Sequence, residues 1–278
     1  MIFYQETLDF PGNSFSLLRD LIKDKIGIYY DDSKKDILAD KLTPLALERN
    51  FTNFVDYYYF LKYDPEGKEE WDKIADALSV QETYFFREYE HLKVLSEHII
   101  PDLYEKGERY VKIWSSACAT GEEPLSIAIV LNEKGWFDKM RIEIFASDIS
   151  NSALEKAKKG IYKERSFRNF PNDLIDKYFI KVENGYKIIP DIHKKVIWKK
   201  ANLVSKQEIV DLSKSKIIFC KNVFIYFSDD IIQKVIRIFE ENMENPGYLF
   251  IGLSESLLRF SHSFDLQIIG GAFVYVKK

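Results

Sequence analysis

Apolar residues recur at helical spacing through the first 80 residues. The segment 14–28 carries its large apolar side chains three or four positions apart, at Phe15, Leu18, Ile22 and Ile26. This spacing places them on one helix face, and similar patterns predict helices over 31–50, 51–63 and 68–80. Strand-like alternation of apolar and polar residues is not evident here. We therefore predict an all-α N-terminal domain over residues 1–80.

After residue 110 the pattern changes to apolar strands that alternate with amphipathic helices. The predicted strands span 110–117, 141–148, 216–222, 247–253 and 271–278, and the predicted helices begin at 121 or span 151–160 and 229–243. This alternation predicts an α/β fold with a doubly wound sheet, whose ligand site lies at the carboxyl ends of the strands. The last strand follows Gly270-Gly271 and can pair antiparallel.

One segment of this second part has a different pattern. Asn184-Gly185 separates two stretches in which apolar and polar residues alternate. This dipeptide is a strong signal for a two-residue hairpin turn. We predict a small antiparallel β insertion over about 178–200, within a second domain that spans 81–278.

The composition is that of a soluble globular chain. Of its 278 residues, 46% are hydrophobic and 30% charged, and the formal net charge of −4 argues against non-specific nucleic-acid binding. The two cysteines, Cys118 and Cys220, cannot form a disulfide framework. The opening MIFYQETLDF has no signal-peptide pattern, and no apolar run is long enough to span a bilayer. We expect a cytoplasmic protein that does not insert into membranes.

The strand-turn-helix unit at 113–131, IWSSACATGEEPLSIAIVL, has the form of a nucleotide-binding unit. A dinucleotide turn uses several glycines so that backbone N–H groups reach a pyrophosphate. Here Gly121 is followed by Glu122 and Glu123, whose carboxylates would repel a diphosphate and disfavour an NAD-dependent dehydrogenase. They suit a ligand with an amino group and a sulfonium, such as S-adenosylmethionine. The next strand ends in Asp148, which is placed to accept both hydroxyls of a ribose.

These acids also have a purely structural interpretation. Thr120 and Glu123 have the spacing of a capping box, and Asp148 can cap the helix that follows it. Glutamates at a helix start are stabilising without any ligand. Taken alone, the turn leaves both interpretations open.

The junction between the two predicted domains carries a similar spacing. Ser79 and Glu82 form a second possible capping box. Thr83 and Arg87 would then lie four positions apart on one helix face, so both can point into an interdomain cleft.

Polar residues follow two further predicted strands. Asn202 and Leu203 end a short strand, where Asn202 can hydrogen-bond an adenine edge. The strand over 216–222 ends in Lys221 and Asn222, at the edge where a doubly wound fold keeps its ligand.

An aromatic turn follows this last strand. Phe224, Tyr226 and Phe227 can wall an adenine or methionine pocket. The alternative is that these aromatic side chains belong to the core and that Lys221 extends to solvent.

Taken together, these residues resemble the chemotaxis receptor methyltransferases of the CheR family. The matching segments are QETYFFRE (81–88), WSSACATGEEPLSIA (114–128), FASDISNSALEKAKKGIY (145–162), ANL (201–203), IFCKNVFIYF (218–227), GYLFIGLSESL (247–257) and GAFVYV (271–276). They follow the family order over about residues 80–278, and the helical part fits the family's N-terminal domain in length. The resemblance implies a class I methyltransferase-like fold and S-adenosylmethionine-dependent methyl esterification of glutamate side chains on chemoreceptors, with S-adenosylhomocysteine as the second product.

The resemblance also implies site residues, position by position. The implied cofactor-binding residues are Gln81, Thr83, Arg87, Glu123, Asp148, Asn202, Leu203, Lys221 and Asn222, and the implied catalytic residues are Tyr226, Arg87 and Lys221. No metal is implied. The chain has Gln81 where the family often has asparagine, and Lys221 where arginine is usual, which removes a bidentate fork. The short hairpin argues against tethering to a receptor's C-terminal peptide.

Methyl esterification needs positioning rather than a base. A glutamate carboxylate is already ionised at pH 7, since its usual pKa is about 4.3. We expect Arg87 and Lys221 to attract the acidic substrate and Tyr226 to orient it by a hydrogen bond.

The helical domain carries a cationic stripe of Lys34, Lys35, Lys41 and Arg49. A solvated face is the simple interpretation, whereas the resemblance favours a docking surface for an acidic receptor helix. The expected partner is the cytoplasmic helical region of chemoreceptors, and the expected state is a monomer. Two alternatives stay open: a methyltransferase for a different acceptor, and a cofactor-binding signalling module without turnover.

Overall fold

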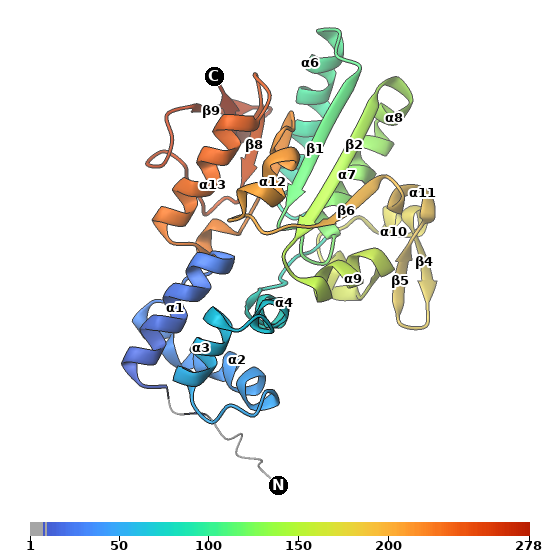
Figure 1. The fold of residues 1–278 in the computed structure, drawn as a ribbon. Helices are drawn as coiled ribbons and strands as arrows, with labels where there is room; N and C mark the ends of the chain where they lie inside the picture. The colour runs from blue at the N-terminus through green and yellow to red at the C-terminus, as the bar shows by residue number, and fades with distance from the viewer. Residues whose placement is uncertain (1–7, 9) are drawn as a thin grey trace.

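The computed structural model describes residue 8 and residues 10–278. Most of the opening MIFYQETLDF, and with it the expectation about a signal peptide, lies outside the described residues. Helices α1 (Gly12–Ile26) to α4 (Gly67–Leu78) lie beyond the end of the sheet at which β1 (Tyr110–Ser116) and β2 (Arg141–Asp148) terminate (Figure 1). None of the described helices is long and apolar enough to cross a membrane.

The helical part packs around an apolar core of its own. The four apolar residues predicted on one face of α1 are all buried, as are Leu38 and Leu42 of α2. Glu70 of α4 is fully buried and accepts hydrogen bonds from Arg49 Nε at 2.9 Å and the Tyr57 hydroxyl at 3.2 Å. The predicted helices are confirmed; the remaining bounds are η1 (Asp32–Lys34), α2 (Lys35–Glu48) and α3 (Phe54–Tyr63).

Seven of the described strands form one sheet in the order β6-β2-β1-β7-β8-β10-β9. In this order the neighbouring strands β6, β2, β1, β7 and β8 are parallel, and β10 pairs antiparallel with both β8 and β9. The predicted doubly wound sheet with an antiparallel last strand is therefore confirmed. The chain runs outward in opposite directions from β1 and β7, which makes a topological switch point between them. The other bounds are β6 (Val196–Lys200), β7 (Ile217–Cys220), β8 (Tyr248–Ile251), β9 (Phe264–Ile269) and β10 (Ala272–Lys277).

Helices cover both faces of this sheet. Along β7, Ile217 and Phe219 face one core, whereas Ile218 and Cys220 face the other. Burial on both faces explains why this strand is a continuous apolar run. Helices α5 to α8 pack in the first core, and α12 and α13 pack in the second. The bounds are α5 (Tyr89–Val94), the π-helical turn η2 (Leu95–Ile99), α6 (Ile100–Glu105), α7 (Glu122–Glu133), α8 (Trp136–Lys139), α9 (Asn151–Lys159), α12 (Lys206–Ser213), η4 (Phe224–Tyr226) and α13 (Asp229–Asn242).

A small antiparallel sheet of order β3-β5-β4 is inserted after α9. Its strands β4 (Phe179–Val182) and β5 (Gly185–Ile188) meet across the Asn184-Gly185 turn, which confirms the predicted hairpin. The predicted extent of about 178–200 is too long, because Val196–Lys200 pair in parallel with β2 as the edge strand β6. The remaining bounds are β3 (Ile161–Tyr162), η3 (Glu164–Phe167), α10 (Asn172–Tyr178) and α11 (Pro190–His193).

The junction over 79–88 does not form the predicted helix. Phe85 is fully buried there, and its ring centroid lies 4.8–5.5 Å from those of Tyr162, Phe167, Phe170 and Phe179. Inserting this ring among four others outweighs the local capping signal. The predictions of a capping box at Ser79 and of a shared helix face for Thr83 and Arg87 are therefore wrong.

Gly121, in the turn after β1, has no space for a side chain. Its φ is 95°, and a Cβ atom would lie 2.8 Å from the Trp198 ring and 2.9 Å from the Ala157 Cβ. Gly107 has a φ of 90° but nothing within 4 Å of the same position. We expect Gly121→Ala to lower the free energy of unfolding by about 2–4 kcal/mol and Gly107→Ala by about 1 kcal/mol, measured by urea denaturation. Equal losses would show that backbone conformation alone, and not close packing, requires Gly121.

Candidate active site

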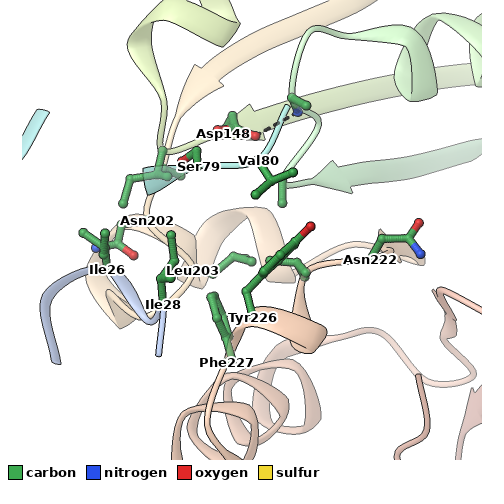
Figure 2. A pocket seen from close by; sticks show the side chains of 15 residues that line it. Ile26, Ile28, Ser79, Val80, Asp148, Asn202, Leu203, Asn222, Tyr226 and Phe227 are labelled. Carbon is green, nitrogen blue, oxygen red and sulfur yellow. Dashed lines mark hydrogen bonds between the residues drawn. The ribbon is translucent and has the colours of Figure 1, made fainter. Parts of the chain in front are cut away.

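A cavity lies at the switch point, at the carboxyl ends of four parallel strands (Figure 2). It encloses about 620 Å³, including its open mouth. It brings together six of the residues that the sequence indicated: Asp148, Asn202, Leu203, Asn222, Tyr226 and Phe227. The helical part and the junction add Ile26, Ile28, Ser79 and Val80, which sequence reasoning missed. Their approach to the sheet is a tertiary contact that has no local signal.

Asp148 ends β2, and its two carboxylate oxygens accept N–H groups from the flanking loops. Oδ2 accepts from Ala119 N and Oδ1 from Ser150 N, both at 2.8 Å. Burial raises the pKa of Asp148, although these N–H groups act to lower it. Ser150, and not Asp148, caps α9, because its Oγ accepts from Ala153 N at 3.1 Å. A carboxylate has about four acceptor positions, so two remain for a ligand.

Asn202 and Leu203 form the side of the cavity next to α1. The Asn202 amide donates to the Lys25 carbonyl at 2.6 Å and accepts from Val204 N at 3.1 Å. It therefore holds the last turn of α1 against this loop, and each amide atom keeps one further hydrogen-bonding position. Leu203 is buried and supplies an apolar wall.

Tyr226 lies in the short turn η4 after β7. Figure 2 shows its hydroxyl directed into the cavity beside Asn222. The Tyr226 carbonyl accepts from Tyr29 N at 2.8 Å, and Phe227 forms an isolated antiparallel bridge with Ile28. The helical part thus holds the turn that carries this tyrosine.

Lys221 is buried outside the cavity lining. Its Nζ lies 3.2 Å from Glu88 Oε2 and 3.4 Å from Glu123 Oε2, and it donates to the Arg87 carbonyl at 3.1 Å. With a side chain that is 2% exposed, Lys221 does not extend to solvent, so that part of the alternative is wrong. Its other part holds for Phe224, which belongs to the core, whereas Tyr226 and Phe227 line the cavity. In this structure the charge of Lys221 is directed to internal carboxylates and not to the cavity mouth.

The two glutamates of the turn have different partners. Glu123 Oε1 accepts from Ser115 Oγ at 2.7 Å. Glu122 is buried and accepts from Thr120 Oγ1 at 2.6 Å and Ser166 Oγ at 2.9 Å, and burial raises its pKa. No side chain of the described residues caps the start of α7, so the predicted capping box is wrong.

Three predicted residues of the junction also lie outside the described cavity lining. Gln81 donates to Ser152 Oγ at 3.1 Å and so connects the junction to α9. Arg87 turns its guanidinium back to the Glu82 carbonyl at 3.0 Å. Thr83 is half-buried. Gln81 directly follows Val80, which lines the cavity, and the Arg87 carbonyl accepts a hydrogen bond from Lys221.

Two half-buried carboxylates beside the site were missed by the sequence analysis. Glu88 pairs with Lys221, and its Oε1 accepts from Leu253 N at 3.2 Å. Glu255 accepts backbone N–H groups from the loops after β7 and β8. Both lie in segments that match the family pattern, but their partners are distant in sequence and give no local signal.

The chain matches known proteins over nearly its whole length. Residues 81–269 match the SAM-binding domain of the CheR methyltransferases, and residues 13–79 match the all-alpha domain of the same family. The chain belongs to the CheR methyltransferase family. The chemotaxis protein methyltransferase 2 of Vibrio cholerae is 36% identical, covering 91% of this chain and 88% of that relative. The chemotaxis protein methyltransferases of Borreliella burgdorferi and Escherichia coli are 32% and 31% identical, covering 90% and 94% of this chain and 90% and 91% of those relatives.

The cavity of this CheR-family methyltransferase fits S-adenosylmethionine, the family's cofactor. Its described lining combines one buried carboxylate with apolar walls from Ile149, Leu203 and Val223, and contains no lysine or arginine. A diphosphate would need such cations or a glycine-rich turn with free backbone N–H groups, and the Asp148 carboxylate would repel it, whereas an adenosyl sulfonium needs neither. The described residues also include no cluster of histidine, cysteine and carboxylate side chains that could hold a metal ion.

The Glu88–Lys221 pair is expected to make folding stability depend on acid pH. Burial acts to raise the pKa of Glu88, but His91, Lys221 and the Leu253 N–H outweigh it and lower the pKa to about 2, from a usual value of 4.5. A lowered pKa contributes stability above about pH 4.5 that is lost as the pH falls towards 2. Urea denaturation should therefore show Glu88→Gln to be less stable than wild type at pH 7, with the difference shrinking between pH 4.5 and 2. A constant difference across this range would contradict the assignment.

Proposed function

We propose that this protein transfers the methyl group of S-adenosylmethionine to glutamate side chains of chemoreceptors, with S-adenosylhomocysteine as the second product. The observation that carries this proposal is one cavity that contains both the Asp148 carboxylate and the Tyr226 hydroxyl, in a chain of the CheR family. The relatives named above are chemotaxis methyltransferases, which supports a receptor as substrate. The setting that this function requires is the cytoplasm, where a monomer would meet the helical region of the receptors.

The cavity residues divide into two groups along the proposed ligand. Asp148 would accept the ribose hydroxyls, and Ile149 and Leu203 would contact the adenine. Glu123 and Lys221, next to the lining, would shape the amino-acid end. When bound, the cofactor supplies a methyl group on a sulfonium, which is open to attack by a carboxylate oxygen.

The chain's own residues would act by positioning. The acceptor carboxylate is ionised at pH 7, so no base has to remove a proton. Tyr226 would donate a hydrogen bond to one carboxylate oxygen and leave the other free to attack at roughly 3–3.5 Å. The apolar side chains of Val80, Val223 and Phe227 would exclude water from this space. Such a bond orients the acceptor without the loss of nucleophilicity that a buried ion pair would cause.

The helical part, over about residues 1–80, is the proposed receptor-docking domain. Its predicted cationic stripe is largely engaged within the protein: Lys34 pairs with Asp31 at 3.2 Å, Lys41 donates to the Ala77 carbonyl at 2.8 Å, and Arg49 pairs with Glu70 at 2.9 Å. These charges therefore give little support to receptor docking. The place of this domain in the fold gives more, because Ile26 and Ile28 line the cavity wall.

The function is tested with tritiated S-adenosylmethionine, purified protein and receptor-containing membranes. The expected result is protein-bound label that is released as methanol by mild base, which identifies carboxyl methyl esters. Base-stable label would point to a different acceptor group. Cofactor binding without any transfer to receptors would overturn the proposal.

Tyr226→Phe separates orientation of the acceptor from binding of the cofactor. Loss of one hydrogen bond to an ionised acceptor should lower kcat about 20-fold, because such bonds contribute about 1.5–3 kcal/mol. The affinity for S-adenosylhomocysteine should change by less than about threefold, since the ring is retained. Initial rates at saturating cofactor, with calorimetry for affinity, measure both quantities. An unchanged kcat would remove Tyr226 from the mechanism.

A further inference from the structure

Glu255 is a half-buried carboxylate that connects two loops of the site. It lies in the loop after β8, and both of its oxygens accept backbone N–H groups. Oε2 accepts from Asn222 N at 2.8 Å and from Gly252 N at 2.6 Å. Oε1 accepts from Phe224 N at 2.8 Å and from Ile225 N at 3.3 Å. The two loops that follow β7 and β8 are thus held by a single side chain.

Three of these four donors belong to the segment that leads from β7 to Tyr226. Asn222, the first of them, has a φ of 58°, which is uncommon for a residue other than glycine. Asparagine adopts this conformation more readily than most residues, and here its backbone N–H is held by the Glu255 carboxylate. The side chain of Asn222 is itself packed closely, because a Cβ on Gly252 would lie 2.5 Å from Asn222 Nδ2. The path of this segment is therefore fixed from the β8 side.

A carboxylate is the side chain that matches four converging donors. Its two oxygens offer about four acceptor positions, whereas a glutamine amide would turn an N–H₂ group towards two of the N–H groups. Hydrogen bonds to an ionised acceptor are about twice as strong as those between neutral groups. Burial raises the pKa of Glu255, and the N–H groups of both loops oppose this rise.

We propose that Glu255 is a positioning residue for methyl transfer, which acts by holding residues 222–226 so that Asn222 lines the cavity and the Tyr226 hydroxyl faces into it. Glu255 does not line this cavity in the described structure, so its effect has to pass through the loop. The expected effect of Glu255 on turnover rests on the proposed function, whereas its expected effect on cofactor binding does not.

A double-mutant cycle tests the proposal with purified full-length protein. Glu255→Gln should lower kcat about 30-fold and weaken S-adenosylhomocysteine binding about tenfold, because Asn222 and Tyr226 both move. Tyr226→Phe should lower kcat about 20-fold in the wild-type background but less than threefold in the Glu255→Gln background, since the hydroxyl is already misplaced. A residue that only stabilised the fold would leave the two losses multiplicative, and that result would overturn the proposal.

Glu240→Gln is the matched control. Glu240 lies on α13 and allows the same glutamate-to-glutamine substitution. It accepts a hydrogen bond from Ser261 Oγ, at the far end of the loop that carries Glu255. It should leave both kcat and S-adenosylhomocysteine affinity unchanged. Should Glu255→Gln not fold, Glu255→Asp keeps the charge but shortens the reach, and the same cycle applies to it. If the wild-type protein methylates no receptor, the proposed function fails. The role of Glu255 is then tested by calorimetry alone. An unchanged affinity of the Glu255 variant for S-adenosylhomocysteine would overturn this inference.

Discussion

Asp148→Ala is expected to weaken the binding of S-adenosylhomocysteine by about 100-fold or more. The carboxylate has two acceptor positions left after bonding to Ala119 N and Ser150 N, which matches the two hydroxyls of a ribose. Hydrogen bonds to a charged group contribute about 1.5–3 kcal/mol each, and every 1.4 kcal/mol is tenfold in affinity. Isothermal titration calorimetry at one salt concentration measures the loss.

The loss has to be separated from damage to the two loops that Asp148 holds. A 2′,3′-dideoxy analogue of S-adenosylhomocysteine makes this possible, because it removes the hydroxyls from the ligand instead of the carboxylate from the protein. Wild type should bind the analogue about 100-fold more weakly than the parent, whereas Asp148→Ala should bind the two within about threefold of each other. Asp64→Ala, which removes one exposed side-chain bond to Glu66 N outside the described cavity lining, is the control for loss of a carboxylate. Equal discrimination by wild type and Asp148→Ala would refute the ribose assignment.

The strand pattern predicted more of the site than any single motif did. Assigning strands to 141–148 and 216–222 is enough to bring Asp148 and Asn222 to one edge, because parallel strands in a doubly wound sheet end on the same side. Apolar periodicity is a local property, so a sequence can display it. Apolar periodicity also predicted the helices of the N-terminal part, since the four residues predicted on one face of α1 are all buried.

The features that the sequence did not reveal depend on distant partners. Asn202 bonds to Lys25, 177 positions away, and this contact brings the helical part to the cavity. Glu255 reaches back about 30 positions to the loop after β7. At the junction the local signal was misleading, because burial of Phe85 among other rings decides the backbone path there. The spacing of apolar and capping residues indicates the secondary structure that a segment favours by itself, whereas tertiary contacts decide which structure it adopts.

Lys221 shows how one buried cation sets the balance of charge beside the cavity. The acidic turn indicated a site that accepts a cation, yet Glu123 already has the Lys221 ammonium at 3.4 Å. Glu88 approaches the same ammonium at 3.2 Å, so one lysine compensates two carboxylates that are 12% and 16% exposed. The cluster keeps a net negative charge beside the cavity, which favours a cationic ligand and leaves Tyr226 as the group that faces the acceptor.

Lys221→Met is therefore expected to be one of the most destabilising single substitutions in the chain. It keeps the volume of the side chain but leaves two buried carboxylates without their cation, and removal of one partner from a buried pair costs about 3–5 kcal/mol. Urea denaturation at pH 7 measures the loss. Adding Glu88→Gln to Lys221→Met should restore part of the stability, because one of the uncompensated charges is then removed.

Lys216→Met separates this effect from the general cost of removing a buried lysine. Lys216 is also buried, but its partners Glu108 and Glu244 are 43% and 45% exposed and lie 3.6 and 3.7 Å away. Water can solvate those carboxylates after the substitution, so a loss of about 1 kcal/mol is expected. Two results would each show that the Lys221, Glu88 and Glu123 charges do not hold together the turn after β1, the junction over 79–88 and the end of β7. One is that Lys221→Met loses no more stability than Lys216→Met, and the other is that adding Glu88→Gln lowers the stability of Lys221→Met further.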